Sequence, residues 1–443
     1  MPSDRIELPP RETMRRHLLT ALGRYWSATS DPVATLPVAA VPVTAVSGPL
    51  RLTSIALPDW GGACGVDGAL LVPAEAAPPG ADWRGVDWWL ASFLLLEAWH
   101  ERVWEQTHGP IHSYSFRLPG WDKRVWQRAW ANRVALFLRA LAGHKNAGAD
   151  LDLLLGPLPP PDYLVTHDVD AIRKTLPIRL KQGAFNLFNA GRAIARGDLG
   201  KSAVKIRQTL RFLFGQEDWD TLAILLELER CHGIRARFHL YADPRPKSLR
   251  RWLFDPAYDV ARPSPRAYLR ALATAGAEIG LHPSFETWRE TAPMAAQRAY
   301  LEQATGTPVT TCRQHWLRFS WRDTWSAQQA AGLTSDTTLM LNDRPGFRNA
   351  AALAWQPWDT STARAHRLTA LPTVLMDSHC YDYQPMTAAE RHQSIRGWLD
   401  ECRVVHGQIA VLWHPHTLTA DYGWGDGFKE MIAMLQEQTP CPV

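Results

Sequence analysis

Residues 163–170, YLVTHDVD, form an apolar run of β-prone residues that ends in His167, Asp168 and Asp170. Two carboxylates this close repel each other, so their presence indicates either a cation held between them or one carboxylate kept protonated. The alternative is a helix cap followed by a solvated turn, because aspartate is a favoured capping residue. This stretch alone leaves both interpretations open.

Four further apolar runs also end in a polar, chemically competent side chain. They are residues 278–284 (EIGLHPS), 311–316 (TCRQHW), 333–336 (LTSD) and 409–414 (IAVLWH). In parallel α/β folds, sites assemble at the carboxyl ends of the strands. Repetition of the pattern is hard to explain by helix caps and favours a functional site.

Composition indicates an ordinary globular protein. The chain has 443 residues, which is enough for two or three domains. It is 46% hydrophobic and 21% charged, as is ordinary for a globular protein. No window approaches the ~18 uninterrupted apolar residues of a membrane span. The first residues lack the apolar centre of a signal peptide, so we expect a cytoplasmic protein. A net charge of +4 argues against nucleic acid as a partner. The six cysteines show no CxxC spacing, which argues against a thiolate zinc site.

The proline-rich segment at 156–161 predicts a linker between two domains. Residues 1–155 are expected to form a smaller mixed α/β domain of unknown role. Its predicted strands and helices are 50–57, 69–72, 87–108 and 125–142. His100, Glu101, Glu105 and His108 invite a metal interpretation, but a solvated helix face is the expectation.

Residues 160–443 alternate between strand and helix patterns and predict a parallel α/β domain. The seven expected strands are 163–167, 235–241, 277–282, 309–313, 333–337, 370–376 and 408–413. Periodicity alone allows either a closed barrel or an open sheet.

The segment 173–214 interrupts this series with a basic helical insert. It carries ten basic residues, one acid (Asp198) and apolar residues at helical spacing. We expect helices that project from the domain with their charges largely solvated. One interpretation is a helical face packed on the body. The other is contact with an anionic membrane surface or an anionic glycan carrier.

The order of these motifs resembles the polysaccharide deacetylases, or chitooligosaccharide-deacetylase-like carbohydrate esterases. Residues 166–170 resemble their first motif, 281–284 the second, 313–316 the third and 412–414 the fifth, with Asp336 at the place of the fourth. The match spans residues 160 to 420 and is most similar to a bacterial subgroup that is found with surface-polysaccharide genes. That subgroup has a helical N-terminal extension, which residues 87–141 resemble. The resemblance implies an irregular (β/α)7 barrel.

The resemblance also implies roles for individual residues. Asp168 would be the general base, and Arg313 would orient it. Asp170 and His282 would bind a divalent metal, most simply zinc. His414 would protonate the leaving amine, tuned by Asp336.

One position departs from the family pattern. Where the second motif has a further histidine, this chain has Glu286. A carboxylate can ligate zinc, so Glu286 is the first candidate for the third ligand. The alternatives are His315, His167 or loss of the metal.

The function implied is metal-dependent removal of an acetyl group from an N-acetylated sugar in a glycan, glycolipid or glycan precursor. Two alternatives stay open: a metal-dependent amidase with a non-sugar substrate, and a degenerate carbohydrate-binding protein without activity. The sequence leaves the sugar, the metal and the oligomeric state undetermined.

Overall fold

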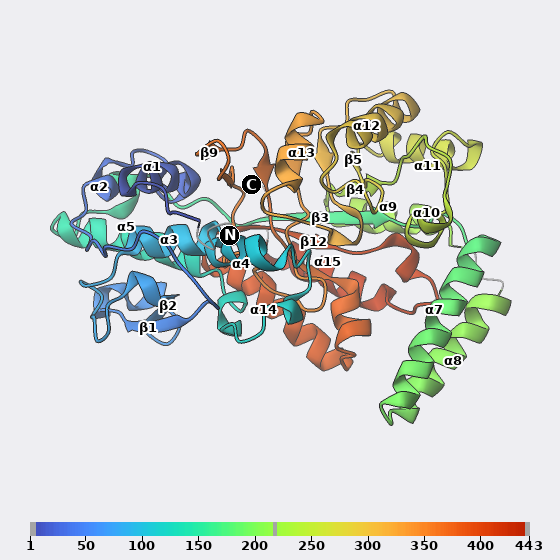
Figure 1. Ribbon diagram of the computed structural model, residues 1–443, viewed down its shortest axis with the longest axis horizontal. Helices are drawn as coiled ribbons and strands as arrows, with labels where there is room; N and C mark the ends of the chain where they lie inside the picture. Colours follow the sequence, from blue (N-terminus) through green and yellow to red (C-terminus); the bar gives the residue numbers. More distant parts are fainter. Residues whose placement is uncertain (1–5, 216–218, 439–443) are drawn as a thin grey trace.

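The computed structural model describes residues 6–215 and 219–438. The first five residues of the N-terminal stretch and the last five of the chain therefore lie outside the described part. Figure 1 shows an elongated molecule with the N-terminal elements at one end and a helical hairpin at the other. None of the described helices is long and apolar enough to cross a membrane. The five cysteines that the structure describes are free thiols.

A parallel sheet organises the C-terminal part of the chain. Its strands follow the order β10-β7-β6-β5-β4-β3-β12-β11, and every neighbouring pair is parallel. The strands are β3 (Asp162–Val169), β4 (Arg237–Leu240), β5 (Glu278–Leu281), β6 (Thr311–Cys312), β7 (Ser335–Asp336), β10 (Thr369–Ala370), β11 (Thr373–Met376) and β12 (Gln408–Leu412).

The two edge strands of this sheet are consecutive in the chain. Only Leu371 and Pro372 separate β10 from β11. The Leu371 amide donates to the carbonyl of Asp336, and the Ala410 amide donates to the carbonyl of Pro372. The single segment 369–376 therefore joins both edges of the sheet and closes it. Counted in this way the barrel has seven strand positions, so the predicted (β/α)7 class is confirmed.

Helices cover the outside of the barrel (Figure 1). They are α9 (Leu222–Cys231), α10 (Leu249–Phe254), α11 (Pro263–Thr274), α12 (Thr291–Thr305), α13 (Thr324–Ala330), α14 (Ala388–Val404) and α15 (Gly425–Gln438). Although helices cover the sheet, β3 and β4 are not continuously apolar, because they also carry buried polar residues such as Thr166, Asp168 and His239. Val165, Phe238, Leu240, Ile409 and Val411 all lie in the core between strands and helices.

The N-terminal part contains the expected strands and helices. Its elements are α1 (Arg11–Ala21), α2 (Asp31–Ala34), β1 (Leu52–Ala56), β2 (Ala69–Pro73), α3 (Trp88–Leu96), α4 (Trp99–His108), α5 (Trp130–Lys145) and α6 (Leu151–Leu155). Strands β1 and β2 pair antiparallel. The predicted helical segment 87–108 is divided into two helices at Ala98, which adopts a left-handed conformation with φ 44°. A further small pair, β8 (Trp358–Asp359) and β9 (Arg364–Ala365), lies in the C-terminal part.

The N-terminal part shares its core with the barrel part. Its apolar cluster includes Trp321, Trp325 and Trp355. The expectation of a solvated face on α4 is wrong for two of its residues, because His100 and Glu101 are buried. Glu101 accepts a hydrogen bond from the Trp321 indole at 2.8 Å, so this face contacts the barrel part instead of solvent. The division into two domains stays a prediction.

Candidate metal centre

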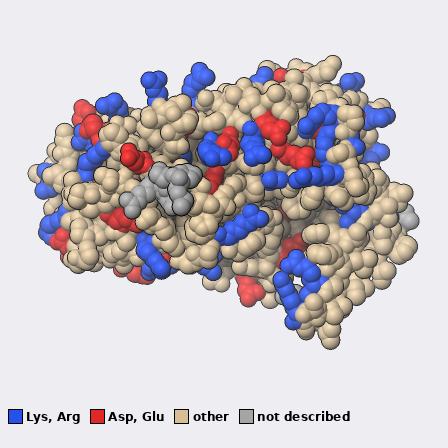
Figure 2. All heavy atoms as spheres, in the orientation of Figure 1, with Lys and Arg blue, Asp and Glu red and all other residues tan. Residues whose placement is uncertain are grey.

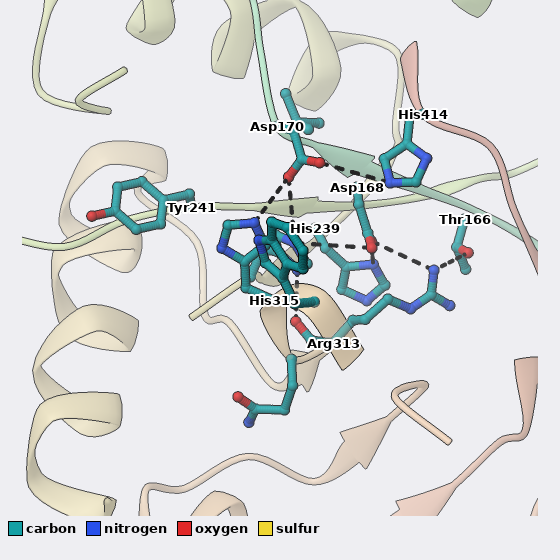
Figure 3. Close-up of polar contacts among 12 residues, drawn as sticks. Thr166, Asp168, Asp170, His239, Tyr241, Arg313, His315 and His414 are labelled. Carbon is teal, nitrogen blue, oxygen red and sulfur yellow. Dashed lines mark hydrogen bonds and ion pairs between the residues drawn. The ribbon is translucent and has the colours of Figure 1, made fainter. Parts of the chain in front are cut away.

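The predicted catalytic and metal-binding residues lie at the carboxyl ends of the strands, at one end of the barrel. Asp168 lies at the end of β3 and Asp170 just beyond it, while His282 follows β5. Arg313 follows β6, and His414 lies two residues after β12. The structure brings these five side chains together, as the sequence predicts. Figure 3 shows Asp168, Asp170, Arg313 and His414 in this group. The arrangement follows from the topology, because parallel strands end at the same edge.

Among the described residues, one group has the geometry to hold a metal ion, and it consists of Asp170, His282 and His315. One ligand atom from each lies within 4.8 Å of the others. The Asp170 Oδ1 atom is 3.6 Å from His282 Nε2 and 3.7 Å from His315 Nε2. His315 enters through a short 3-10 turn, His315–Leu317, whose residue Trp316 has a left-handed φ of 57°.

The chemistry of these atoms fits a cation. His282 Nδ1 donates to the carbonyl of Arg313 at 2.7 Å, which orients the ring so that Nε2 faces Asp170. Asp170 Oδ1 and His282 Nε2 are buried and have no hydrogen-bond partner among the described residues. Buried polar atoms without a partner are costly, and a bound cation would satisfy both of these. His315 has its own supporting carboxylate, since its Nδ1 lies 3.6 Å from Asp255 Oδ1.

Asp168 lies beside this group and is held by three basic side chains. Its oxygens are 3.3 Å from His239 Nδ1, 3.5 Å from Arg313 Nη1 and 3.9 Å from His282 Nε2. Burial alone would raise the pKa of Asp168, but the charges of His282 and Arg313 outweigh it and hold the pKa well below its usual range. Arg313 is fixed in turn, because Nη1 donates to Thr166 Oγ1 at 2.8 Å. Asp168 is therefore an ionised acceptor in a nearly dry setting.

His239, on β4, is a site residue that the sequence did not reveal. It is fully buried, and burial lowers its pKa to about 3, so the ring is neutral. A single histidine within an apolar strand is more often a packed core residue than a site residue. Only the register of β4 beside β3, which pairs His239 with Asp168, exposes its role.

His414 forms a pair with a second residue that was not predicted. Its Nδ1 lies 3.0 Å from Asp377 Oδ1, and its Nε2 lies 3.7 Å from Asp170 Oδ2. Asp377 also accepts from the His414 amide and the Thr417 hydroxyl, each at 2.9 Å. Burial would lower the pKa of His414, but the Asp377 carboxylate overcomes this and raises it to about 10. Asp377 directly follows β11, which is the same strand-end signal that marked the other residues.

The structure places Asp336 away from His414. Asp336 accepts hydrogen bonds from Trp325 Nε1 at 3.0 Å and Gln328 Nε2 at 2.7 Å. These contacts tie helix α13 to the end of β7. The position beside His414 that was expected for Asp336 belongs to Asp377.

The structure also separates Glu286 and His167 from the ligand group. The chain turns between Ser284 and Thr287, and the Glu286 carboxylate pairs with Arg250 at 2.8 Å. His167 Nδ1 is hydrogen-bonded to the Trp413 carbonyl and His167 Nε2 to the Glu229 carboxylate, each at 2.6 Å, so neither nitrogen is available to a metal. Among the candidates for third ligand, His315 alone belongs to the group.

A pocket of about 170 Å³ adjoins the candidate metal centre. Asp170 and His315 line this pocket together with Trp316, His416 and Tyr422. Trp316 is 40% exposed, which leaves a ring face available to a ligand. Lys181 and Gln182 line the pocket from the helical insert.

Comparisons with known proteins concern the fold. No protein-family model matches the chain, and no curated protein matches its sequence. The chain is similar to the crystal structure of a Mycobacterium smegmatis protein assigned to the polysaccharide deacetylases, with 19% identity over 63% of this chain and 88% of that one, at a TM-score of 0.37. It is also similar to a CE4 family pseudoenzyme from Bacillus anthracis, with 11% identity over 63% and 62% of the two chains and a TM-score of 0.29.

A mutant of that pseudoenzyme with restored activity gives a similar result, with 12% identity, 63% and 64% coverage and a TM-score of 0.31. All three likenesses have TM-scores below 0.5. At such identities and TM-scores they carry no argument about activity or substrate, which rests on the site.

Proposed function

We propose that this protein is a divalent-metal-dependent hydrolase that removes the acetyl group from an N-acetylated sugar. The observation that carries the proposal is the group Asp170, His282 and His315 beside two further ionisable residues, Asp168 and His414. One carboxylate and two imidazoles are a common ligand set of catalytic zinc. Three protein ligands also leave a coordination position for water or substrate.

The residues around the ligands divide the proton chemistry between them. Asp168 accepts the proton of the attacking water, and Arg313 and His239 orient its carboxylate. His414 gives a proton to the departing amine nitrogen, with its ring held by Asp377. A bound metal would supply Lewis-acid polarisation of the acetyl carbonyl and of water. Base and acid follow two neighbouring strands, β3 and β12, and therefore lie at the same end of the barrel.

The pocket supports a sugar as the acetyl carrier. Sugar rings stack on aromatic faces, and Trp316 offers such a face beside His315. Tyr422 adds a second aromatic side chain to the wall. We therefore favour a glycan or glycan precursor over a non-sugar amide.

Acetate release from N-acetylated oligosaccharides tests this proposal. Purified protein should release acetate, lose the activity when a chelator removes the metal, and regain it on addition of Zn²⁺. Asp168→Asn should lower the rate by about 10²–10⁴. Asp162→Asn, the same change at the exposed start of the same strand, is the matched control and should leave the rate unchanged. Acetate release that survives full metal removal, or that Asp168→Asn leaves unchanged, would overturn the proposal.

A further inference from the structure

The helical hairpin of α7 (Leu176–Ala195) and α8 (Leu199–Phe214) exposes an unusual amount of apolar surface. Eleven of the twenty exposed large apolar side chains among the described residues belong to it. Phe188 is 62% exposed, Leu199 70% and Phe214 72%. Single exposed leucines are ordinary, but apolar residues concentrated on one projecting element indicate an interaction surface.

The packing between the two helices is inverted relative to a water-soluble hairpin. The buried residues on α7 are Gly183, Asn186 and Ala190, and those described on α8 are Ser202, Thr209 and, near its C-terminal end, Phe212. Phe212 packs with Trp219, and Leu213 lies against Gly183. The other buried positions are small or polar, and most leucine, isoleucine and phenylalanine side chains of the hairpin are exposed. Small and polar residues at helix contacts with apolar residues outside are the arrangement found where lipid surrounds a helix pair.

The hairpin is also strongly basic. Residues 176–214 contain eight lysines and arginines and one acid, Asp198. Arg192, Arg196 and Arg207 are exposed beside the apolar side chains. Figure 2 shows lysine and arginine side chains next to largely uncharged surface on the projecting part of the molecule. Apolar residues flanked by exposed arginines complement an anionic phospholipid surface, where the apolar part enters the interface and the cations meet the headgroups.

We propose that the hairpin α7–α8 docks this protein on an anionic lipid membrane. The hairpin leaves the barrel directly at the site, because Lys181 and Gln182 of α7 line the pocket above Asp170. A helix of 20 residues is about 30 Å long, so a docked hairpin holds the pocket within that distance of the lipid surface. If the proposed function also holds, the substrate is a membrane-anchored glycan.

Vesicle co-sedimentation of the full-length protein tests the docking without any substrate. The protein should bind vesicles of phosphatidylcholine with phosphatidylglycerol, and bind pure phosphatidylcholine far less. Raising salt from 0.05 to 0.5 M (concentrations chosen for the assay) should weaken the binding, because exposed charges are screened. Salt-insensitive binding, or no binding to the anionic vesicles, would overturn the proposal.

Matched substitutions locate the contact. Leu187→Ser with Phe188→Ser should abolish sedimentation, whereas Leu153→Ser, at an 86% exposed leucine on α6, should not. Arg192→Ala and Arg207→Ala should each weaken binding by roughly fivefold, whereas Arg270→Ala, at an exposed arginine on α11, should have no effect. Acetate release from a water-soluble oligosaccharide should stay unchanged in all of them, so failure of docking and failure of the proposed function remain distinguishable.

The same variants also test whether a second copy of this chain, rather than a membrane, covers the apolar surface of the hairpin α7–α8. If analytical ultracentrifugation shows a dimer that Leu187→Ser with Phe188→Ser dissociates, the hairpin covers a second copy of this chain and the membrane proposal is wrong. A monomer that binds anionic vesicles supports it.

Discussion

Asp377 and Asp336 are both fully buried aspartates at the ends of the strands β11 and β7. Their hydrogen-bond partners differ, and so do the roles that we infer for them. Asp377 contacts the His414 ring and its backbone amide, whereas Asp336 binds Trp325 and Gln328. A carboxylate on Nδ1 of a histidine fixes the ring orientation and leaves Nε2 for proton transfer. Asp377 is therefore a positioning residue, and Asp336 is a structural one.

The substitution Asp377→Asn should lower kcat by about 10²–10⁴ while metal content stays unchanged, because the ring loses the charge that orients and stabilises its protonated form. Asp336→Asn is the matched control. It should reduce the free energy of unfolding by about 1–3 kcal/mol through its lost hydrogen bonds and leave kcat near the wild-type value. Steady-state kinetics and urea unfolding of both variants make the comparison. Loss of kcat only in Asp336→Asn would restore the original assignment of Asp336 to His414.

At the scale of elements, the strands of the barrel could be predicted from sequence because buried parallel strands are apolar runs with polar ends. The same signal placed Asp168, Asp170, His282, Arg313 and His414 at one edge. It did not reveal His239, which lies inside a strand rather than at its end. It also could not distinguish Glu286 from His315, because that choice depends on which way the turn after β5 directs its side chains.

Gly280 shows how closely β4, β5 and β6 pack beneath the site. A Cβ atom on Gly280 would lie 2.4 Å from Thr311 Oγ1 and 2.7 Å from His239 Cδ2, so the His239 ring occupies the space of a side chain. Gly280→Ala should therefore reduce the free energy of unfolding by about 1–3 kcal/mol and also lower activity, because His239 contacts Asp168.

The matched control is Gly397→Ala in the exposed part of α14, where a Cβ meets nothing within 4 Å. There alanine should increase the free energy of unfolding by about 0.5–1 kcal/mol, since it favours the helix. Thermal or urea unfolding measures both. A Gly280→Ala protein as stable and active as wild type would mean that His239 is not tightly held against β5.

At the scale of the whole molecule, buried neutral histidines make stability depend on pH. His379 accepts from the Met376 amide and donates to the Leu341 carbonyl, and burial lowers its pKa from 6.5 to about 4. Between these two pH values the unfolded chain binds more protons than the folded protein. The stabilisation is therefore complete above pH 6.5 and is lost as pH falls toward 4.

The free energy of unfolding should accordingly drop between pH 6.5 and 4, and His379 should account for at most about 3 kcal/mol of the drop. His379→Gln, which keeps a donor toward Leu341, should make the pH dependence shallower by a similar amount. Urea unfolding at pH 7 and pH 4.5 compares the two proteins. Equal pH dependence in both would show that His379 is solvated or already protonated in the folded state.

The metal content of purified protein tests the central claim most directly. Elemental analysis should find one divalent metal ion per wild-type chain. Glu286→Gln should retain it, and His315→Ala should lose it while keeping the wild-type circular dichroism spectrum, because His315 and not Glu286 lies with Asp170 and His282. A wild-type protein that binds no divalent metal, or a Glu286→Gln variant that loses the metal while His315→Ala retains it, would contradict this account.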